Sequence, residues 1–374
     1  MDVLKIKPVI KKAYPVIYDD ENSRIIIGGF GVNTVLNDPM GAVKFTFSLL
    51  TGENSIGDIC KIVCNEYPKL TKDDVLGLIN DLNSERFIED TAHIGSDVLS
   101  EYSKKRFHRN INFFSSFISL EDNKYISEKR IQDCKVGIIG LGGLGSHIVY
   151  DLAGMGFMHI KAIEFDKVEL SNLNRQILYN EEDIGKSKAK CAKERLSKFS
   201  PKLNFEVFEE KVSSAADVES AFSDVDLIIL VADRPKYLLG SWVNEAAVNL
   251  NVPLFAAGIE AQRALYHTVI PHKTGCEFCW LQNVKKNEPI SDLVLKKRTE
   301  LNLLGDNTAI SPLVSAATGL IVTEIVRYVT GIGELQAAGQ ELSIDFLTMR
   351  VKVVEKWEMA ETCPVCGGEA NAVN

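Results

Sequence analysis

The chain has 374 residues, of which 42 are Lys or Arg and 51 are Asp or Glu, giving a formal net charge of −9. This length suggests two or three domains, and the shares of hydrophobic residues (45%) and charged residues (25%) are those of a globular protein. These values exclude a disordered or collagen-like chain, and the acidic balance argues against nucleic-acid binding, which needs a basic surface.

The sequence indicates neither export nor membrane insertion. Its first residues, MDVLKIKPVIKKAYPV, carry Lys and Pro where a signal peptide needs an apolar run. The most apolar long stretch, 310–326, is interrupted by Ser, Pro, Thr and Glu324, whereas a membrane span needs about 20 apolar residues. We therefore expect a cytoplasmic protein with no membrane partner. In such a protein, eight cysteines indicate metal or thiol chemistry rather than disulfides.

Residues 1–95 form the first predicted domain, a small winged-helix-like α+β unit. The β-branched run Arg24–Ile27 predicts a strand, and Phe87-Ile88 predicts another at the end of the domain. Helices are predicted at 42–50, 55–66 and from Thr71 onward. The domain contains neither a Cys/His ligand pair nor an acid–base cluster. We expect a recognition module, because an exposed strand edge can add a peptide strand; a purely structural extension is the alternative.

A polar and basic segment, 96–112, is predicted to be a linker into the larger domain, 113–374. In that domain, short apolar runs alternate with helical patterns. Strands are predicted at 135–139, 160–165, 205–208, 227–231 and 253–257. Such alternation predicts an α/β fold with a doubly wound, mainly parallel, Rossmann-like sheet. The stretch 342–357 instead has the alternation of antiparallel strands.

A glycine-rich loop follows the first of these strands and precedes a helix predicted at 146–155. Its G-x-G-x-x-G spacing is made by Gly140, Gly142, Gly143 and Gly145. Glycine lets the backbone approach a phosphate closely, and the helix N-terminus supplies N–H donors and partial positive charge. In this context the loop predicts a nucleotide site.

A carboxylate stands where such a site needs one. Glu164 ends the second strand, about 20 residues beyond the loop, the position from which an acid can hold ribose hydroxyls. Asp166 lies two residues further on and is either a second ligand or a turn residue.

Cations near the loop argue against a nicotinamide dehydrogenase. Arg175 and Lys188 would converge on the loop with the amides of Asn172 and Gln176, which suits a triphosphate. Asp233, at the end of the strand 227–231, faces the same crevice and is well placed to bind Mg²⁺.

These motifs, together with two C-x-x-C pairs, resemble the ubiquitin-activating-enzyme superfamily in its ThiF/MoeB branch over about residues 106–368. The resemblance implies that the chain adenylates a carboxylate with MgATP and releases pyrophosphate. It also implies that Glu164 binds ribose, that Asp233 binds Mg²⁺, and that the phosphates are bound by Asn172, Arg175 and Lys188.

The same resemblance extends to Arg106-Phe107-His108-Arg109, which matches the R-Y-x-R segment of the family. Its second arginine reaches the ATP phosphates of a neighbouring subunit, so a homodimer is expected. The alternative for Arg109 is a solvated charge in a linker. The expected catalytic residues are thus Arg175, Lys188, Asp233 and Arg109.

Two C-x-x-C pairs predict a structural zinc site. Four thiolates suit tetrahedral Zn²⁺, and the ligands would be Cys276, Cys279, Cys363 and Cys366. Two redox or unpaired motifs are the alternative. No cysteine occurs between Glu288 and Thr308, where thioester-forming members of the family carry a reactive one. This argues against transfer through an enzyme thioester.

The two domains together resemble the peptide-modifying adenylators of microcin C and pantocin A biosynthesis, which act on ribosomally made precursor peptides. We expect the first domain to bind the leader of such a peptide. Residues 280–310 are expected to form a crossover loop with a small excess of cations, at Lys285, Lys286, Lys296, Lys297 and Arg298. A solvated loop is the simpler interpretation of these charges. If they contact the substrate, the excess suits an acidic core peptide and favours activation of glutamate side chains, as in pantocin A, over a C-terminal asparagine, as in microcin C.

Two further functions stay open. A sulfur-carrier adenylyltransferase would act on a C-terminal Gly-Gly, but it needs no added recognition domain. A non-catalytic docking protein would present a leader peptide, but it has no use for the ATP residues Arg175, Lys188 and Asp233.

Overall fold

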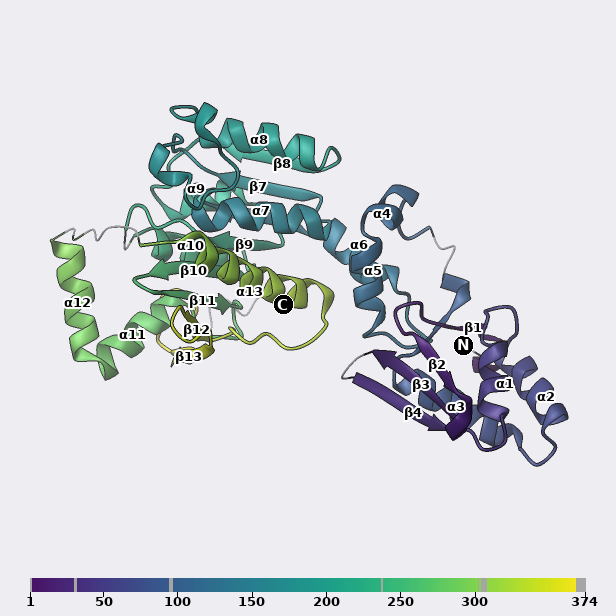
Figure 1. Ribbon diagram of the computed structural model, residues 1–374. Coiled ribbons are helices and arrows are strands. Elements are labelled where there is room, and N and C mark those ends of the chain that lie inside the picture. Colours follow the sequence, from purple (N-terminus) through teal and green to yellow (C-terminus); the bar gives the residue numbers. More distant parts are fainter. Residues whose placement is uncertain are drawn as a thin grey trace. The chain divides into compact units, whose positions relative to one another are not determined.

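The computed structural model of the chain describes residues 2–29, 32–93, 97–236, 238–301, 303 and 308–367. Within it the chain folds into two compact units, residues 1–129 and 130–374. Figure 1 shows both units.

The first unit is built from two small antiparallel sheets and a set of helices. The two-stranded sheet pairs β1 (Pro8–Ile10) with β5 (Ile88–Asp90), and the three-stranded sheet has the order β2 (Val16–Asp19), β3 (Arg24–Gly29), β4 (Val32–Asn37). The helices that complete this part are α1 (Ala42–Leu49), α2 (Ile56–Glu66) and α3 (Lys72–Ser84). The three predicted helices and the two predicted strands therefore form.

Strand β3 separates the core of this unit from its surface. Ile25 and Ile27 point inward and are almost fully buried in a core with residues of α1, α2 and α3. On the other face, Ile17, Ile26 and Val35 lie opposite one another in register. Ile17 and Val35 are about half exposed, so an apolar row crosses the outer face of this sheet.

The segment predicted as a linker is helical. It forms α4 (Glu101–Arg106) and α5 (His108–Ser115) within the first unit. Lys11, just after β1, holds the end of α5, because its Nζ donates hydrogen bonds to the carbonyl oxygens of Ser115 (2.6 Å) and Ile118 (2.8 Å). This contact and the buried face of α5 explain why the segment packs within the first unit and is not a free linker. Helix α6 (Tyr125–Asp133) follows it in the chain.

The second unit contains, in its described residues, one eight-stranded sheet of order β13-β12-β11-β10-β9-β6-β7-β8. The strands are β6 (Lys135–Ile139), β7 (His159–Ile163), β8 (Asn204–Phe208), β9 (Leu227–Leu230), β10 (Leu254–Glu260), β11 (Arg263–Val269), β12 (Gln340–Asp345) and β13 (Val351–Lys356). Pairing is parallel from β8 to β10 and antiparallel from β10 to β13. This confirms the predicted doubly wound sheet with antiparallel strands at its C-terminal end.

Helices cover both faces of this sheet (Figure 1). They are α7 (Gly143–Met155), α8 (Lys188–Phe199), α9 (Ala215–Ala221), α10 (Leu239–Asn249) and α13 (Ser311–Thr330). One core joins α9 and α10 to Ile228 and Leu230 of β9. On the opposite face, α13 packs against α7 and contacts β10 and β11. By length and composition α13 would also qualify as a membrane span, but half of that stretch is buried inside the unit.

The segment expected to be a crossover loop also forms helices, α11 (Glu277–Asn287) and α12 (Pro289–Glu300). Pro289 opens α12, where its missing N–H costs nothing. Within α12 the cations pair with acids: Lys296 with Asp292 at 2.5 Å and Lys297 with Glu300 at 2.7 Å. These pairs favour the helix and neutralise two of the five cations predicted in this segment.

Candidate active site and metal centre

The glycine loop ends in an open helix N-terminus. Helix α7 begins at Gly143, three residues before its predicted start at Ser146. Its N-cap, Gly142, offers no side-chain hydrogen bond. The first N–H groups of the helix therefore lack a side-chain cap and form a site for an anion. Gly145 is required here, since a Cβ atom on it would lie 1.9 Å from the carbonyl oxygen of Gly140.

The loop lies where the strand order of the parallel sheet reverses. Gly140 has a φ of +98°, and a Cβ atom on it would lie 2.8 Å from the Cβ of Ala232. The ends of β6 and β9 are therefore in contact, and Asp233 follows directly after Ala232. Open α/β sheets bind their ligands in the crevice at this switch point. The predicted Mg²⁺ ligand thus borders the glycine loop.

The peptide groups of Leu141, inside the loop, are held from both sides. Its N–H donates to Glu164 Oε2 at 2.8 Å, and its carbonyl oxygen accepts from the Tyr179 hydroxyl at 2.9 Å. The other oxygen of Glu164 accepts from the N–H of Asp166 at 2.8 Å. Burial raises the pKa of Tyr179 well above its usual value, so the hydroxyl stays protonated and can donate. The sequence predicted only ribose binding for Glu164 and did not identify Tyr179.

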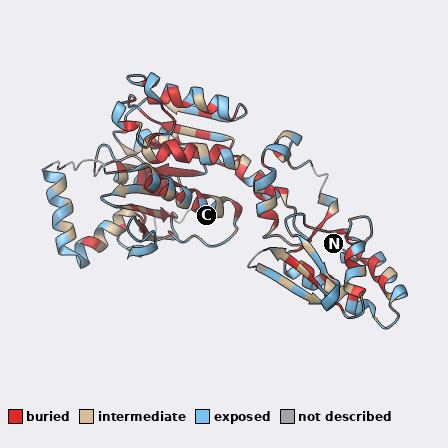
Figure 2. Ribbon diagram, viewed as in Figure 1, coloured by how far each residue is buried: buried red, intermediate tan, exposed pale blue. Residues whose placement is uncertain are grey.

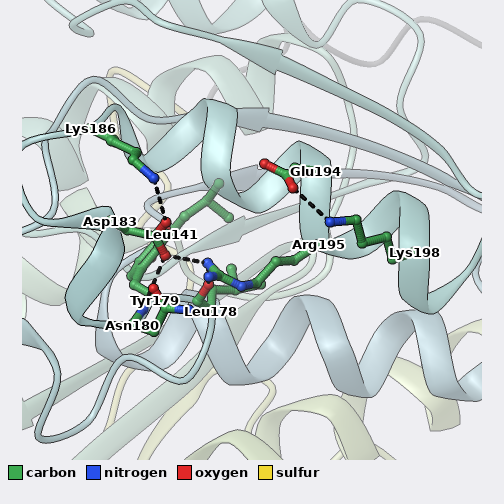
Figure 3. Close-up of polar contacts among 9 residues, drawn as sticks. All are labelled: Leu141, Leu178, Tyr179, Asn180, Asp183, Lys186, Glu194, Arg195 and Lys198. Atoms are coloured by element: carbon green, nitrogen blue, oxygen red, sulfur yellow. Dashed lines mark hydrogen bonds and ion pairs between the residues drawn. The ribbon is translucent and has the colours of Figure 1, made fainter.

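Tyr179 is itself fixed by an ion-pair cluster, shown in Figure 3. Asp183 accepts from the N–H of Asn180 at 3.1 Å and pairs with Arg195 at 2.6 Å. Arg195, from α8, also donates to the carbonyl oxygen of Leu178. The cluster ties the segment around Tyr179 to α8.

Arg175 and Gln176 lie over the start of α7. The Cδ and Nε atoms of Arg175 lie 3.4 Å from where a Cβ atom on Gly143 would be, and its guanidinium is held by the Asn174 side chain at 2.8 Å. Gln176 is buried, and its Oε1 has no hydrogen-bond partner among the described residues. The other atom of this amide, Nε2, faces the loop, 3.8 Å from where a Cβ atom on Gly142 would be.

Two of the predicted phosphate ligands, Lys188 and Asn172, have partners within the protein. Lys188, the first residue of α8, is buried, and its Nζ lies 3.2 Å from Asp166 Oδ2. Asn172 is buried too, and its Oδ1 accepts from the N–H of Glu169 at 3.1 Å. Asp166 therefore serves as the counter-charge of Lys188. Asn172 fixes the turn that leads to Arg175.

Arg109 is exposed on α5 in the first unit. Its role at the phosphates of a second subunit stays a prediction.

Asp233 also lines a pocket of about 790 Å³ in the second unit. The pocket lies between the end of β9, the start of α10, and helices α11 and α12.

The four predicted zinc ligands come together as one buried cluster. Their sulfur atoms all lie within 4.8 Å of one another, and the ligands are Cys276, Cys279, Cys363 and Cys366. Individual Sγ–Sγ distances are 3.4, 3.7 and 3.9 Å. Thiolates about 2.3 Å from a tetrahedral zinc ion would be about 3.8 Å apart. The donor set and its spacing therefore fit Zn²⁺.

Contacts that the sequence did not predict hold the first cysteine pair in place. The N–H of Glu277 donates to the buried Asn244 of α10 at 2.9 Å. The Glu277 carboxylate lies 3.2 Å from His267, whose other ring nitrogen lies 3.8 Å from Glu341. Burial alone would lower the pKa of His267, but hydrogen bonds to these two acids raise it to about 9. The imidazolium therefore ties the start of α11 to the sheet.

Comparison with known sequences places these residues in a family. The profile of the ThiF family matches residues 107–365. The sulfur carrier protein ThiS adenylyltransferase of Escherichia coli (strain K12) is 29% identical over 262 residues, which are 68% of this chain and 94% of that protein. SUMO-activating enzyme subunit 2 of Dictyostelium discoideum is 31% identical over 150 residues, and the match spans only 22% of that longer protein.

Solved structures resemble nearly the whole chain. Escherichia coli MccB, solved with AMPCPP and the peptide MccA, has a TM-score of 0.76 at 21% identity, covering 96% of this chain and 99% of MccB. PaaA has a TM-score of 0.71 at 23% identity, covering 93% of this chain and 100% of PaaA. At these identities the likeness establishes the fold.

Proposed function

The chain belongs to the ThiF family and is an ATP-dependent adenylating enzyme, and on that premise we propose that it activates a carboxylate of a ribosomally made precursor peptide. One observation supports the nucleotide role above the others. An uncapped helix N-terminus, the Arg175 side chain over its first turn, and Asp233 all border one crevice.

In the proposed reaction, a carboxylate oxygen of the peptide attacks the α-phosphorus of ATP. The bond from this phosphorus to the oxygen bridging the α- and β-phosphates breaks, and pyrophosphate leaves with the electron pair. The N–H groups at the start of α7 and the Arg175 guanidinium would stabilise the phosphate charge. No side-chain nucleophile is needed, so the protein acts by positioning two anions and neutralising their charge.

Asp233 is the residue that would hold Mg²⁺, because it is exposed at the crevice and has a carboxylate to offer. When bound, Mg²⁺ would neutralise charge on the triphosphate. The cysteine cluster would hold a structural Zn²⁺ that joins the C-terminal segment to α11.

A precursor peptide is proposed because the first unit, residues 1–129, offers a surface that could bind it. Within this unit, the predicted domain 1–95 would bind the leader of the peptide. β2 and β4 are edge strands of their sheet, and the apolar row Ile17, Ile26 and Val35 crosses its outer face. Edge strands with an apolar face can pair with an added peptide strand. MccB, whose fold covers both units, was solved with the peptide MccA.

Glutamate side chains are our proposal for the activated groups, with a C-terminal asparagine as the alternative. Most cations of α12 are paired within the helix, but Lys285 lines the pocket and has no ion-pair partner among the described residues. An acidic residue of the substrate could supply that partner.

We also propose that the enzyme is a homodimer in which Arg109 reaches the ATP phosphates of the second subunit, and that it is cytoplasmic. A sulfur-carrier substrate is the second candidate, because the ThiS adenylyltransferase relative aligns over 94% of its own length.

Pyrophosphate exchange separates the two candidates. The purified chain would be incubated with MgATP, labelled pyrophosphate, and either a precursor peptide or a carrier protein ending in Gly-Gly. We expect exchange with the peptide alone. Exchange only with the carrier would contradict the proposed peptide substrate. Exchange with neither the peptide nor the carrier would contradict adenylation of both.

A further inference from the structure

The pocket beside Asp233 is mostly apolar. Its walls include Leu239 of α10, Phe278 and Leu281 of α11, and Leu295 of α12. At about 790 Å³ it is large enough for side chains of a bound ligand. Three lysines also line it, Lys236, Lys285 and Lys296, but leucine and aromatic side chains are not ligands for a triphosphate.

Four of the charged groups that line the pocket are held in ion pairs. Lys296 pairs with Asp292 at 2.5 Å, Glu300 pairs with Lys297 at 2.7 Å, and Glu277 is bound by His267. A ligand would therefore meet an apolar surface, together with Lys285, which has no ion-pair partner among the described residues.

The wall formed by α11 is anchored at several points. Its start carries Cys276 and Cys279 of the cysteine cluster. Further along, Trp280 and Asn283 both donate hydrogen bonds to Glu355 of β13. This side of the pocket is therefore formed before any ligand binds, which lowers the entropic cost of binding.

The wall formed by α12 has no such anchor in the core. None of its residues is buried, and Ile290, Leu293 and Val294 are 79%, 55% and 46% exposed. Figure 2 shows this helix coloured as exposed or intermediate, in contrast to the buried strands of the sheet. Leu295 is half-buried because it lines the pocket.

We propose that this pocket binds apolar side chains of the substrate peptide that flank the carboxylate to be adenylated. The pocket is continuous with the crevice, because Ala232 and Asp233 belong to its wall. The enzyme would therefore select a carboxylate with leucine-like neighbours over one with polar neighbours. This inference rests on the proposed function, since it assumes that a carboxylate is activated beside Asp233.

The test uses the full chain and two synthetic peptides, acetyl-Gly-Gly-Leu-Glu-Leu-Gly-Gly-amide and the same peptide with both leucines replaced by serine. Calorimetry measures binding, and pyrophosphate exchange with MgATP measures adenylation. We expect the leucine peptide to bind at least about tenfold more tightly, because burying apolar side chains favours it.

Two matched variants locate the effect. Leu295→Gln should reduce the preference for leucine severalfold, whereas Leu293→Gln, on the same helix but outside the pocket, should leave it unchanged. Leu281→Gln on α11 provides a second pocket variant on a different helix.

Equal binding of the two peptides, binding of neither, or equal effects of Leu293→Gln and Leu295→Gln would overturn the pocket assignment. A clear leucine preference in binding without any pyrophosphate exchange would instead refute the proposed function and leave the assignment standing.

Discussion

The hydroxyl group of Tyr179 donates a hydrogen bond to the carbonyl oxygen of Leu141, at a distance of 2.9 Å. Leu141 is the second residue of the glycine loop, and Glu164 binds the N–H group of the same residue at 2.8 Å. The orientation of the loop therefore depends on two side chains that bind its backbone. Tyr179 acts as a positioning residue for the N–H groups that would face the phosphates.

Replacing Tyr179 by Phe should weaken ATP binding. The change removes one hydrogen bond and leaves a buried carbonyl group unpaired, which costs about 1–3 kcal/mol. If part of that cost falls on the ATP complex, the KM for ATP should rise about five- to tenfold. Pyrophosphate exchange at several ATP concentrations would measure it, and calorimetry should show unchanged peptide binding.

Tyr150→Phe is the matched control. The Tyr150 ring packs edge-to-face on Phe199, and its hydroxyl makes no hydrogen bond in the described part of the chain. Its KM should stay at the wild-type value. An unchanged KM in Tyr179→Phe would show that the loop keeps its orientation without the hydroxyl.

Asp233→Asn should abolish turnover without loss of peptide affinity. The substitution keeps the size of the side chain but removes the charge that would hold Mg²⁺ at the end of β9. We expect pyrophosphate exchange to fall by at least about a hundredfold, while calorimetry with the precursor peptide stays unchanged. Asp73→Asn, at an exposed position of α3, is the control. Full turnover in Asp233→Asn would remove the metal role from this residue.

The sequence predicted the parts of the fold that depend on neighbouring residues. The apolar run Leu227–Leu230 indicates a buried strand by its composition alone. The capping box of Thr71 and Asp74 is likewise recognised from their spacing in the sequence. The four cysteines were found because thiolate pairs have characteristic spacing. For the strand and the capping box, the signal and the structure lie within a few residues of one another. The cysteine site joins two distant segments, but each pair is recognised by its own local spacing.

The contacts that orient the site join distant segments and could not be predicted in this way. Tyr179 reaches Leu141, and Asn244 reaches Glu277, through the packing of separate elements. No periodicity or spacing marks such a tyrosine or asparagine. The helices α11 and α12 were expected as loop, because their polar composition resembles both states and only their i,i+3 and i,i+4 charge pairs favour a helix.

Cys363→Ser should remove the metal and loosen the pocket wall. The wild-type chain should contain about one zinc ion per chain, and the variant should contain almost none, since three thiolates close the site poorly. Because α11 begins inside the cysteine cluster, peptide affinity should fall with the metal. The thermal midpoint should decrease by about 5–10 °C, as expected for a loss of a few kcal/mol.

Cys134→Ser is the control for that experiment, because Cys134 is buried at the start of β6 and outside the cluster. It should keep its zinc. Full zinc content in Cys363→Ser, measured by atomic emission, would show that these thiolates do not form the metal site.

Lys11 predicts how the stability of the first unit changes with pH. Burial lowers the pKa of Lys11 to about 8, against the attraction of Glu89, from 10.5 in the unfolded chain. Between these two values the unfolded state binds more protons than the folded state, so the free energy of unfolding rises with pH. This contribution is fully present above about pH 10.5 and is lost as the pH falls through 8. Its size is up to about 3 kcal/mol.

Urea unfolding of the wild type and of Lys11→Met, followed from pH 7 to pH 10.5, isolates this contribution. The difference in stability between the two proteins should increase with pH in favour of the wild type. Lys12→Met, at the exposed neighbouring position, should show a constant difference from the wild type. A constant difference for Lys11→Met as well would mean that the ammonium group, bound by the carbonyls of Ser115 and Ile118, keeps its proton in the folded state as readily as in the unfolded chain.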